Sequence, residues 1–153
     1  MITGLSHIAF RVSDLDRALA FYSGLLGFPE MFRLYGDDGA LWLVYLRVSE
    51  TTYLELFPGG DPRPEVGRRA LGYNHFCLAV DDLRQTLADL AARGLALEGE
   101  PRLGRDGNWQ YWITDPDGNR IELMEIAPDS LQRQALARLA AARGGEAHAP
   151  ADH

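Results

Sequence analysis

The chain has 153 residues, of which 46% are hydrophobic and 24% charged, as expected for one globular domain with a sizeable core. Its net charge of −7 and pI near 5.0 argue against nucleic acid as a partner, because nucleic-acid binding depends on basic surfaces. No apolar run approaches the roughly 20 residues that span a bilayer, and the amino terminus lacks a signal-like segment, so we expect a cytoplasmic protein without a membrane partner.

The first part of the chain predicts a βαβββ module. Residues 5–12 alternate apolar and other side chains, as a strand does. Ser13 followed by Asp16 has the spacing of a helix cap, and leucines at helical spacing continue to Gly27, which ends the helix. Three further strands are expected, at 30–35, 40–48 and 51–57.

The second part of the chain repeats this order. It predicts a strand at 74–80 and then a helix that Asp81 or Asp82 caps and Gly94 ends. The turn at 115–118, Asp-Pro-Asp-Gly, leads into the last strand, because proline presets one φ angle and glycine supplies a positive one. Two more strands are expected, at 96–101 and 109–114. A last helix, capped by Asp129 or Ser130, is also expected.

These elements divide the chain into five expected units. They are a first module, a linker, a second module, a C-terminal helix and a disordered tail, at 1–57, 58–70, 71–126, 127–143 and 144–153.

Each module begins with a histidine strand and ends with a glutamate strand. His7 and Glu55 stand in the first half where His75 and Glu122 stand in the second. A carboxylate on a largely apolar strand is costly to bury unless it is paired or binds a metal. A lone strand histidine is more often structural, but four matched positions favour one ligand set. Two imidazoles and two carboxylates suit octahedral Ni²⁺, Co²⁺, Mn²⁺ or Zn²⁺, with two positions left open.

Strand alternation places further side chains on the same face as these ligands. The substrate-binding candidates there are Arg11, Tyr53, Phe57, Arg120 and Met124. Cys77 shares this face, and packing as a small buried thiol is its favoured role.

Other candidates are assigned packing or solvent-exposed roles. The three tryptophans are expected to pack in the core or in a dimer rather than to stack on a substrate, and they are Trp42, Trp109 and Trp112. Arg102 and Arg105 lie in a glycine-containing loop, where arginines are usually solvated. His148 and His153 fall in the expected tail.

The motifs together resemble the vicinal oxygen chelate superfamily, and within it glyoxalase I (lactoylglutathione lyase), over about 1–126. The likeness rests on His-x-x-x-x-Val-x-Asp-Leu at His7 and His75, Phe-Tyr-x-x-x-Leu-Gly-Phe at Phe21, and Asp-Pro-Asp-Gly-x-x-Ile-Glu-Leu at Asp115. It implies an α+β fold in which two βαβββ repeats form curved mixed sheets that enclose a metal site. By this likeness the ligands are His7, Glu55, His75 and Glu122, and the protein is a homodimer. Whether the modules pair within one chain or between two stays open.

The resemblance also implies a reaction, a proton transfer through a metal-bound enediolate of a 2-oxoaldehyde thiol adduct. Glu122 matches the family's proton-shuttling carboxylate, and Glu55 is the second acid–base candidate. Arg11 matches an arginine that helps hold glutathione, but Gly59 stands where the family has an asparagine that also contacts it. We therefore expect glutathione to be used weakly or replaced by another thiol. Loop arginines could supply carboxylate contacts instead, and they are Arg68, Arg69, Arg102 and Arg105.

Three alternatives share the fold. An acyl-thioester epimerase uses similar chemistry but commonly has an amide where Glu55 stands. An extradiol dioxygenase needs Fe²⁺ with two histidines and one carboxylate, so a fourth ligand would occupy a reactive position. A small-molecule or drug-binding protein needs no metal, so it would have no use for a complete set of four metal ligands.

Overall fold

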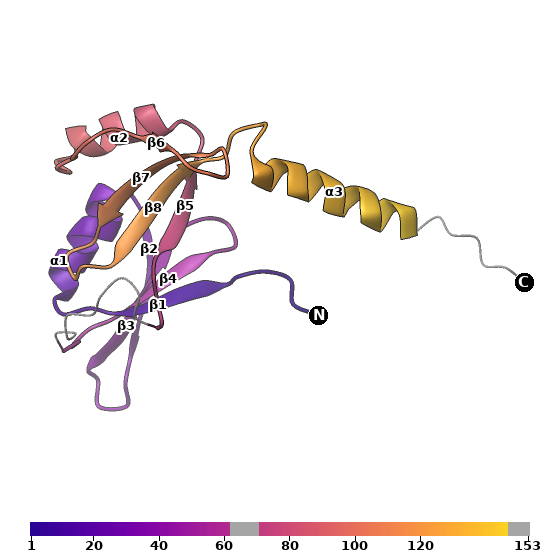
Figure 1. The fold of residues 1–153 in the computed structure, drawn as a ribbon. Helices are drawn as coiled ribbons and strands as arrows, with labels where there is room; N and C mark the ends of the chain where they lie inside the picture. Colours follow the sequence, from indigo (N-terminus) through magenta and orange to yellow (C-terminus); the bar gives the residue numbers. More distant parts are fainter. Residues whose placement is uncertain (62–70, 147–153) are drawn as a thin grey trace, which may run out of the picture.

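The protein, described here from a computed structural model, is defined for residues 1–61 and 71–146 (Figure 1). The first half contains β1 (His7–Arg11), α1 (Leu15–Leu19), the π-helix η1 (Ala20–Leu25), β2 (Glu30–Tyr35), β3 (Leu41–Arg47) and β4 (Tyr53–Phe57). The second half contains β5 (Phe76–Val80), α2 (Leu83–Ala92), β6 (Arg102–Leu103), β7 (Trp109–Thr114), β8 (Arg120–Glu125) and α3 (Leu131–Glu146).

Each half forms its own four-stranded mixed sheet. The strand order is β1-β4-β3-β2 in the first sheet and β5-β8-β7-β6 in the second. The histidine strand and the glutamate strand of each half are neighbours and run parallel, whereas the other pairs are antiparallel. The structure therefore confirms the predicted α+β fold of two βαβββ repeats.

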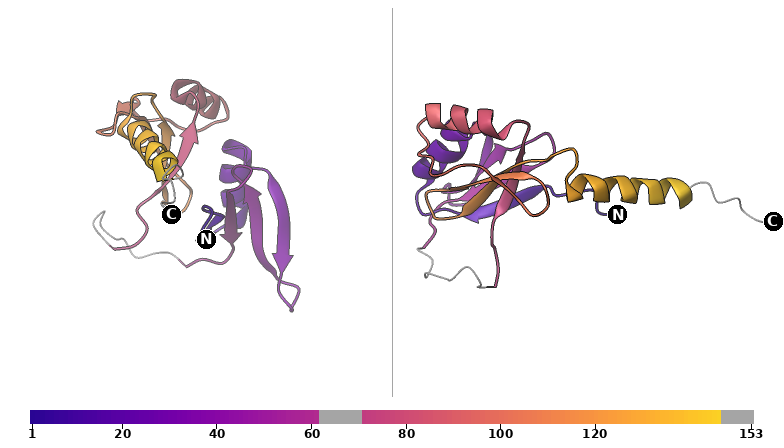
Figure 2. Two further views of the ribbon diagram at one scale, coloured as in Figure 1. Left: turned by 90° about the vertical axis from the view of Figure 1, so that its right-hand side faces the viewer. Right: turned by 45° about the horizontal axis from the view of Figure 1, so that its top comes forward.

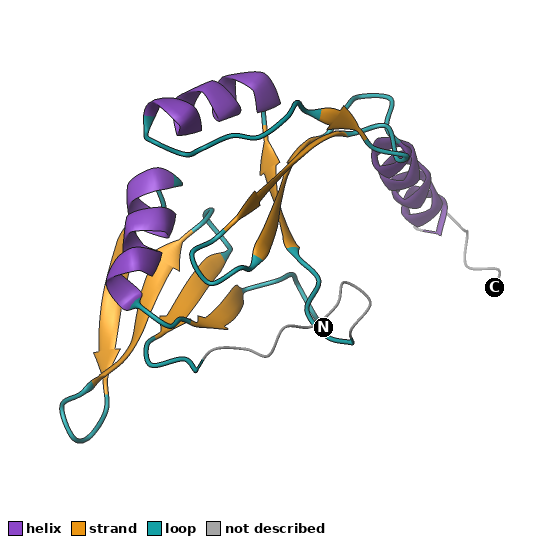
Figure 3. Ribbon diagram, turned by 60° about the vertical axis from the view of Figure 1, so that its left-hand side comes forward, coloured by secondary structure: helices purple, strands orange, loops and turns teal. Residues whose placement is uncertain are grey.

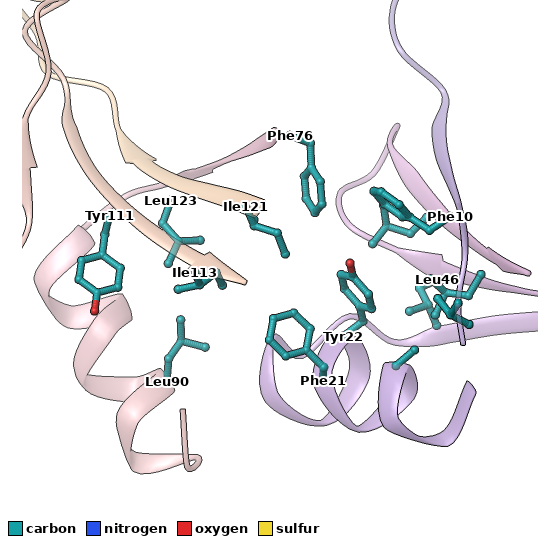
Figure 4. Packing of buried hydrophobic residues seen from close by; sticks show 14 of the residues in the cluster. Phe10, Phe21, Tyr22, Leu46, Phe76, Leu90, Tyr111, Ile113, Ile121 and Leu123 are labelled. Carbon is teal, nitrogen blue, oxygen red and sulfur yellow. The ribbon is translucent and has the colours of Figure 1, made fainter. Parts of the chain in front are cut away.

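The aliphatic faces of both sheets share one core. A helix lies across each sheet (Figure 3), and the buried side chains of the two halves meet between them (Figure 4). Phe10 of β1 and Phe76 of β5 are in ring contact, with centroids 5.6 Å apart. Tyr22 of η1, which is fully buried, stacks on Phe10. The two halves are thus joined through the faces that do not carry the predicted ligands.

A buried hydrogen bond also joins the halves. The Tyr22 hydroxyl donates to Asp115 Oδ2 over 2.7 Å. Asp115 begins the predicted turn and holds it closed, because its carboxylate also accepts from the backbone N–H groups of Asp117 and Asn119. Burial raises the pKa of Tyr22, so its hydroxyl keeps its proton and remains a donor.

The cap of the first helix differs from the prediction. Asp14, and not Ser13, is the N-cap, since its carboxylate accepts from the backbone N–H of Arg17 over 3.0 Å. Ser13 instead donates through its backbone and its hydroxyl to the carboxylate of Asp117 in the other half. Local spacing could not reveal this, because the partner lies about a hundred residues away in the chain.

The edge strand of the second sheet is shorter than predicted. No strand forms at 96–101, and only Arg102–Leu103 pair with β7. The Tyr111 hydroxyl forms two hydrogen bonds with the backbone of Glu98, since it donates to the carbonyl and accepts from the N–H. These backbone groups are therefore not available to pair with a neighbouring strand. The prediction for α2 is confirmed, since Asp82 caps it and Gly94 follows it at a φ of 101°.

The last helix, α3, leaves the body of the molecule (Figure 2). Ser130 is buried and caps it by accepting from the backbone N–H of Arg133, while the Leu131 N–H donates to the Asp106 carbonyl. The helix runs to Glu146. Predicted features at Arg68, Arg69, His148 and His153 lie outside the described residues. Within the described ranges, no helix has both the length and the apolar character needed to cross a membrane.

We predict that Tyr22→Phe lowers the free energy of unfolding by about 1.5–3 kcal/mol, because a buried carboxylate loses a donor. Urea unfolding at pH 7 measures the effect. Tyr35→Phe is the matched control, since Tyr35 is exposed on β2. Equal unfolding free energies for the two variants would contradict the importance of this bond.

Candidate functional site

The first predicted ligand pair forms on β1 and β4. Parallel pairing sets His7 beside Tyr53 and Ala9 beside Glu55, so both ligands lie on one face. His7 Nε2 is 3.5 Å from Glu55 Oε2. Tyr45 of β3, which lies opposite Glu55, brings its hydroxyl to 3.4 Å from His7 Nδ1. Hydrogen bonding to Glu55, together with partial burial, raises the pKa of Tyr45 to about 12.

The second pair has the same arrangement on β5 and β8. His75 directly precedes β5, and its Nε2 is 3.1 Å from Glu122 Oε2. Its Nδ1 is 2.7 Å from Asn74 Oδ1. Trp112 of β7 lies opposite Glu122 and packs edge-on against the His75 ring, with centroids 4.7 Å apart.

Both imidazoles are oriented as metal ligands require. In each, Nε2 faces the glutamate of the same half while Nδ1 meets another polar group. A hydrogen bond from Nδ1–H fixes the tautomer that leaves the Nε2 lone pair free to coordinate a cation. At His75 that bond is donated to the Asn74 amide oxygen, and at His7 the Tyr45 oxygen is in position to accept it.

Glu122 is the most informative member of the set. It is only 6% exposed, and its Oε1 atom is buried with no hydrogen-bond partner among the described residues. A buried carboxylate oxygen without a partner is costly. A divalent cation bound beside His75 would offset that cost, so the residues present fit the metal that the sequence predicts.

The two pairs are not brought together in one chain. The shared core is built from the aliphatic faces, so each ligand pair lies on the face of its sheet that is turned away from that core. Within residues 1–61 and 71–146, no group of three or more potential metal-binding side chains of His, Cys, Asp or Glu is found. A cavity of about 480 Å³ between the halves contains none of the four ligands in its lining, which is Ile8, Ala9, Phe10, Arg11, Gly60, Asp61, Tyr73 and Asn119. Each chain therefore presents two separate half-sites, His7–Glu55 and His75–Glu122.

The substrate-binding candidates divide between the half-sites. Arg11 lies beside Phe57, with Cζ 5.7 Å from the ring centroid, and donates to the Pro58 carbonyl. Tyr53 directs its hydroxyl to the Glu50 carbonyl. In the second half-site, Arg120 stacks on Trp112, with Cζ 4.2 Å from the ring centroid.

Met124 completes the candidates on the second face, since it follows Glu122 by two positions on β8. Arg102 and Arg105 are both exposed, as expected for loop arginines. Gly59 lies near the end of the first half with a φ of 76°.

The structure corrects the packing roles predicted for Cys77 and, in part, for the tryptophans. Cys77 does not pack in the core but is exposed on the ligand face, where its register partner is Glu122. For Trp42, Trp109 and Trp112 the structure excludes core packing, because all three are exposed, while dimer packing, the other role expected for them, stays a prediction. Cys77 and Trp112 are exposed because the ligand face of the second sheet is open within one chain. Trp109 pairs with Glu125 and therefore lies on the other face of β7, where it is exposed at the start of the strand.

Sequence reasoning did not place two aromatic residues beside the glutamates, since it gave Trp112 a packing role and did not single out Tyr45. Tyr45 and Trp112 lie opposite Glu55 and Glu122 in equivalent ladders. The signal was an aromatic residue at the same place in the third strand of each repeat, and it becomes visible only when the strand register is known.

We predict that Cys77 is unreactive despite its exposure. Partial desolvation and the Glu122 charge raise its pKa to about 12, so at pH 9 only on the order of 0.001 of the thiol is ionised. In chelator-treated protein, iodoacetamide should modify Cys77 at least about 100-fold more slowly than in urea-unfolded protein. Glu122→Gln should speed the reaction by removing the negative charge. A native rate equal to the unfolded rate would show that the thiol pKa is not raised.

Comparisons with known proteins agree with this fold. Residues 4–123 match the model of the glyoxalase/bleomycin resistance protein/dioxygenase superfamily. A probable chloroplastic lactoylglutathione lyase of Arabidopsis thaliana is 29% identical over 136 residues, which cover 80% of this chain and 35% of that protein. The ethylmalonyl-CoA/methylmalonyl-CoA epimerase of Cereibacter sphaeroides is 30% identical over 135 residues, covering 82% of this chain and 100% of the epimerase.

A solved structure is also similar. The lactoylglutathione lyase of Agrobacterium tumefaciens matches with a TM-score of 0.59 and 26% identity, over 81% of this chain and 94% of that one. α3 lies beyond the part of the chain that the family model matches. With its two βαβββ repeats and a family match over most of its length, the chain belongs to the glyoxalase/bleomycin resistance protein/dioxygenase superfamily.

Proposed function

We propose that this protein is a metal-dependent isomerase of the glyoxalase I (lactoylglutathione lyase) type, which converts the thiol adduct of a 2-oxoaldehyde into a 2-hydroxyacyl thioester. The observation that carries the proposal is the repeated His–Glu pair, in which buried Glu122 has one oxygen near His75 and one without a partner. The similarity to two lactoylglutathione lyases supports the same reaction.

The proposed ligands are His7, Glu55, His75 and Glu122, and they require two copies of the chain. Because the four ligands do not gather into one group among the described residues of a chain, we propose that the His7–Glu55 pair of one copy meets the His75–Glu122 pair of another. A homodimer with two-fold symmetry would make two such sites. A bound divalent metal ion, Ni²⁺, Co²⁺, Zn²⁺ or Mn²⁺, would hold two adjacent substrate oxygens and stabilise the negative charge that develops on them.

The chain's own residues supply the proton transfer. We assign Glu122 as the base that takes the proton from the carbon bearing sulfur and returns it to the neighbouring carbon. Glu122 would thus serve both as a ligand and as the base, and its Oε1 has no hydrogen-bond partner among the described residues. Glu55 is the second acid–base candidate. The Tyr45 hydroxyl, placed between His7 and Glu55, would keep both in position.

Epimerisation of an acyl thioester is the second candidate function. The similarity to an epimerase favours it, and the same base could remove a proton next to a thioester carbonyl. The carboxylate at Glu55 favours the glyoxalase reaction, because the sequence resemblance places an amide there in epimerases. An assay separates them: methylglyoxal with glutathione, with other small thiols and with no thiol, against methylmalonyl-CoA, each after loading a single metal.

We predict that Glu122→Gln leaves the fold intact and lowers turnover at least about 100-fold, as loss of a general base commonly does. His75→Ala should instead lower the metal content of the folded protein at least about tenfold. Elemental analysis measures metal, and circular dichroism checks the fold. Arg84→Gln, on the exposed surface of α2, is the control for both readouts. Near-normal turnover of Glu122→Gln, or full metal occupancy of His75→Ala, would contradict the assigned roles.

A further inference from the structure

The two half-sites have equivalent ligands but different neighbours. On β4, Tyr53 pairs with His7, whereas the equivalent position of β8, directly before the Phe76–Ile121 pair, is Arg120. Opposite the glutamates, the first half-site has Tyr45 and the second has Trp112. One half-site therefore offers phenol groups and the other a cation stacked on an indole.

Arg120 is held in place by stacking on the Trp112 ring. Its guanidinium carbon is 4.2 Å from the Trp112 ring centroid, and the same ring packs edge-on against His75. Stacking on an aromatic face fixes the plane of a guanidinium and leaves its N–H groups, which lie in that plane, able to donate hydrogen bonds. The Arg120 side chain is thus ordered next to the proposed ligands without a hydrogen bond to them.

Among the described residues, no ion pair neutralises the charge of Arg120. Three ion pairs occur in the described ranges, and none of them involves Arg120. Other arginines are engaged: Arg33 forms a two-bond pair with Glu30, and Arg93 donates to the Leu25 carbonyl. No hydrogen bond of the Arg120 guanidinium is found among the described residues. A stacked guanidinium with free N–H groups suits a planar carboxylate, to which it can donate two bonds.

We propose that Arg120 binds a carboxylate of the substrate and makes the site selective for anionic substrates. This inference rests on the proposed function and deepens it, since it assigns the substrate class. The carboxylate would lie on the His75–Glu122 side of the site, near the two substrate oxygens that a bound metal would hold. Tyr53 occupies the equivalent position of the first half-site, so only the second half-site would bind the carboxylate. This would fix the orientation of the bound substrate.

Two hydroxamates test the inference on the Ni²⁺-loaded protein. Butyrohydroxamate and succinic monohydroxamate have the same chain length and chelate metals through adjacent oxygens, but the second ends in a carboxylate where the first has a methyl group. Isothermal titration calorimetry should show at least about tenfold tighter binding of succinic monohydroxamate, as expected for a charge-assisted contact. Arg120→Met should remove this preference and leave the affinity for butyrohydroxamate unchanged.

The controls separate this inference from the proposed function. Arg84→Met changes an exposed arginine of α2 in the same way and should keep the preference. Arg120→Lys, which keeps the charge without the planar fork, should retain part of it. If both probes bind equally to the unmodified protein, or Arg120→Met keeps the preference, the inference is wrong while the metal site stands. If neither probe binds the Ni²⁺-loaded protein, the proposed metal site fails, and the role of Arg120 fails with it.

Discussion

Both sheets bury their aliphatic faces in one shared core, and this constraint determines where the chemistry can lie. In a strand, neighbouring side chains point to opposite faces, so placing Phe10 and Phe76 in the core turns His7 and His75 outward. The hydrogen bond from Tyr22 to Asp115 strengthens the same arrangement, because it ties the first half to the turn before β8. The core that stabilises the chain thus keeps its two ligand pairs apart.

The open faces have the character of surfaces that meet a partner. Aromatic rings cross the first sheet beside the ligand pair, where Phe32 stacks on Tyr45 and Tyr45 contacts Tyr53. β2 is exposed along its whole length, and Trp42 is 56% exposed. Exposed apolar side chains gathered around polar ligands mark an interaction site more often than a free surface. These features are what the proposed pairing of two copies needs, since the pairing would cover both faces and bury the metal site.

The sequence predicted the ligand faces and the order of elements well, because both follow from short-range rules. Alternation alone placed Glu55 and Glu122 opposite the aliphatic residues, and the repeat identified their histidines. What it could not predict was how the halves pack, since that depends on contacts between distant residues. The errors at Cys77 and Ser13 both come from this limit. Cys77 is exposed because its face is left open, and Ser13 bonds to a turn of the other half.

Complementation between two broken copies tests the central claim most directly. A chain with His7→Ala and a chain with His75→Ala, carrying different tags, are co-expressed and purified through both tags. If each site combines half-sites from two copies, such a heterodimer keeps one intact site of its two, and it should show about half of the metal content and activity of the unmodified dimer. The separate variants should show almost none. A heterodimer as poor in metal and activity as its two parents would mean that the four ligands do not assemble across copies, and the account would be wrong.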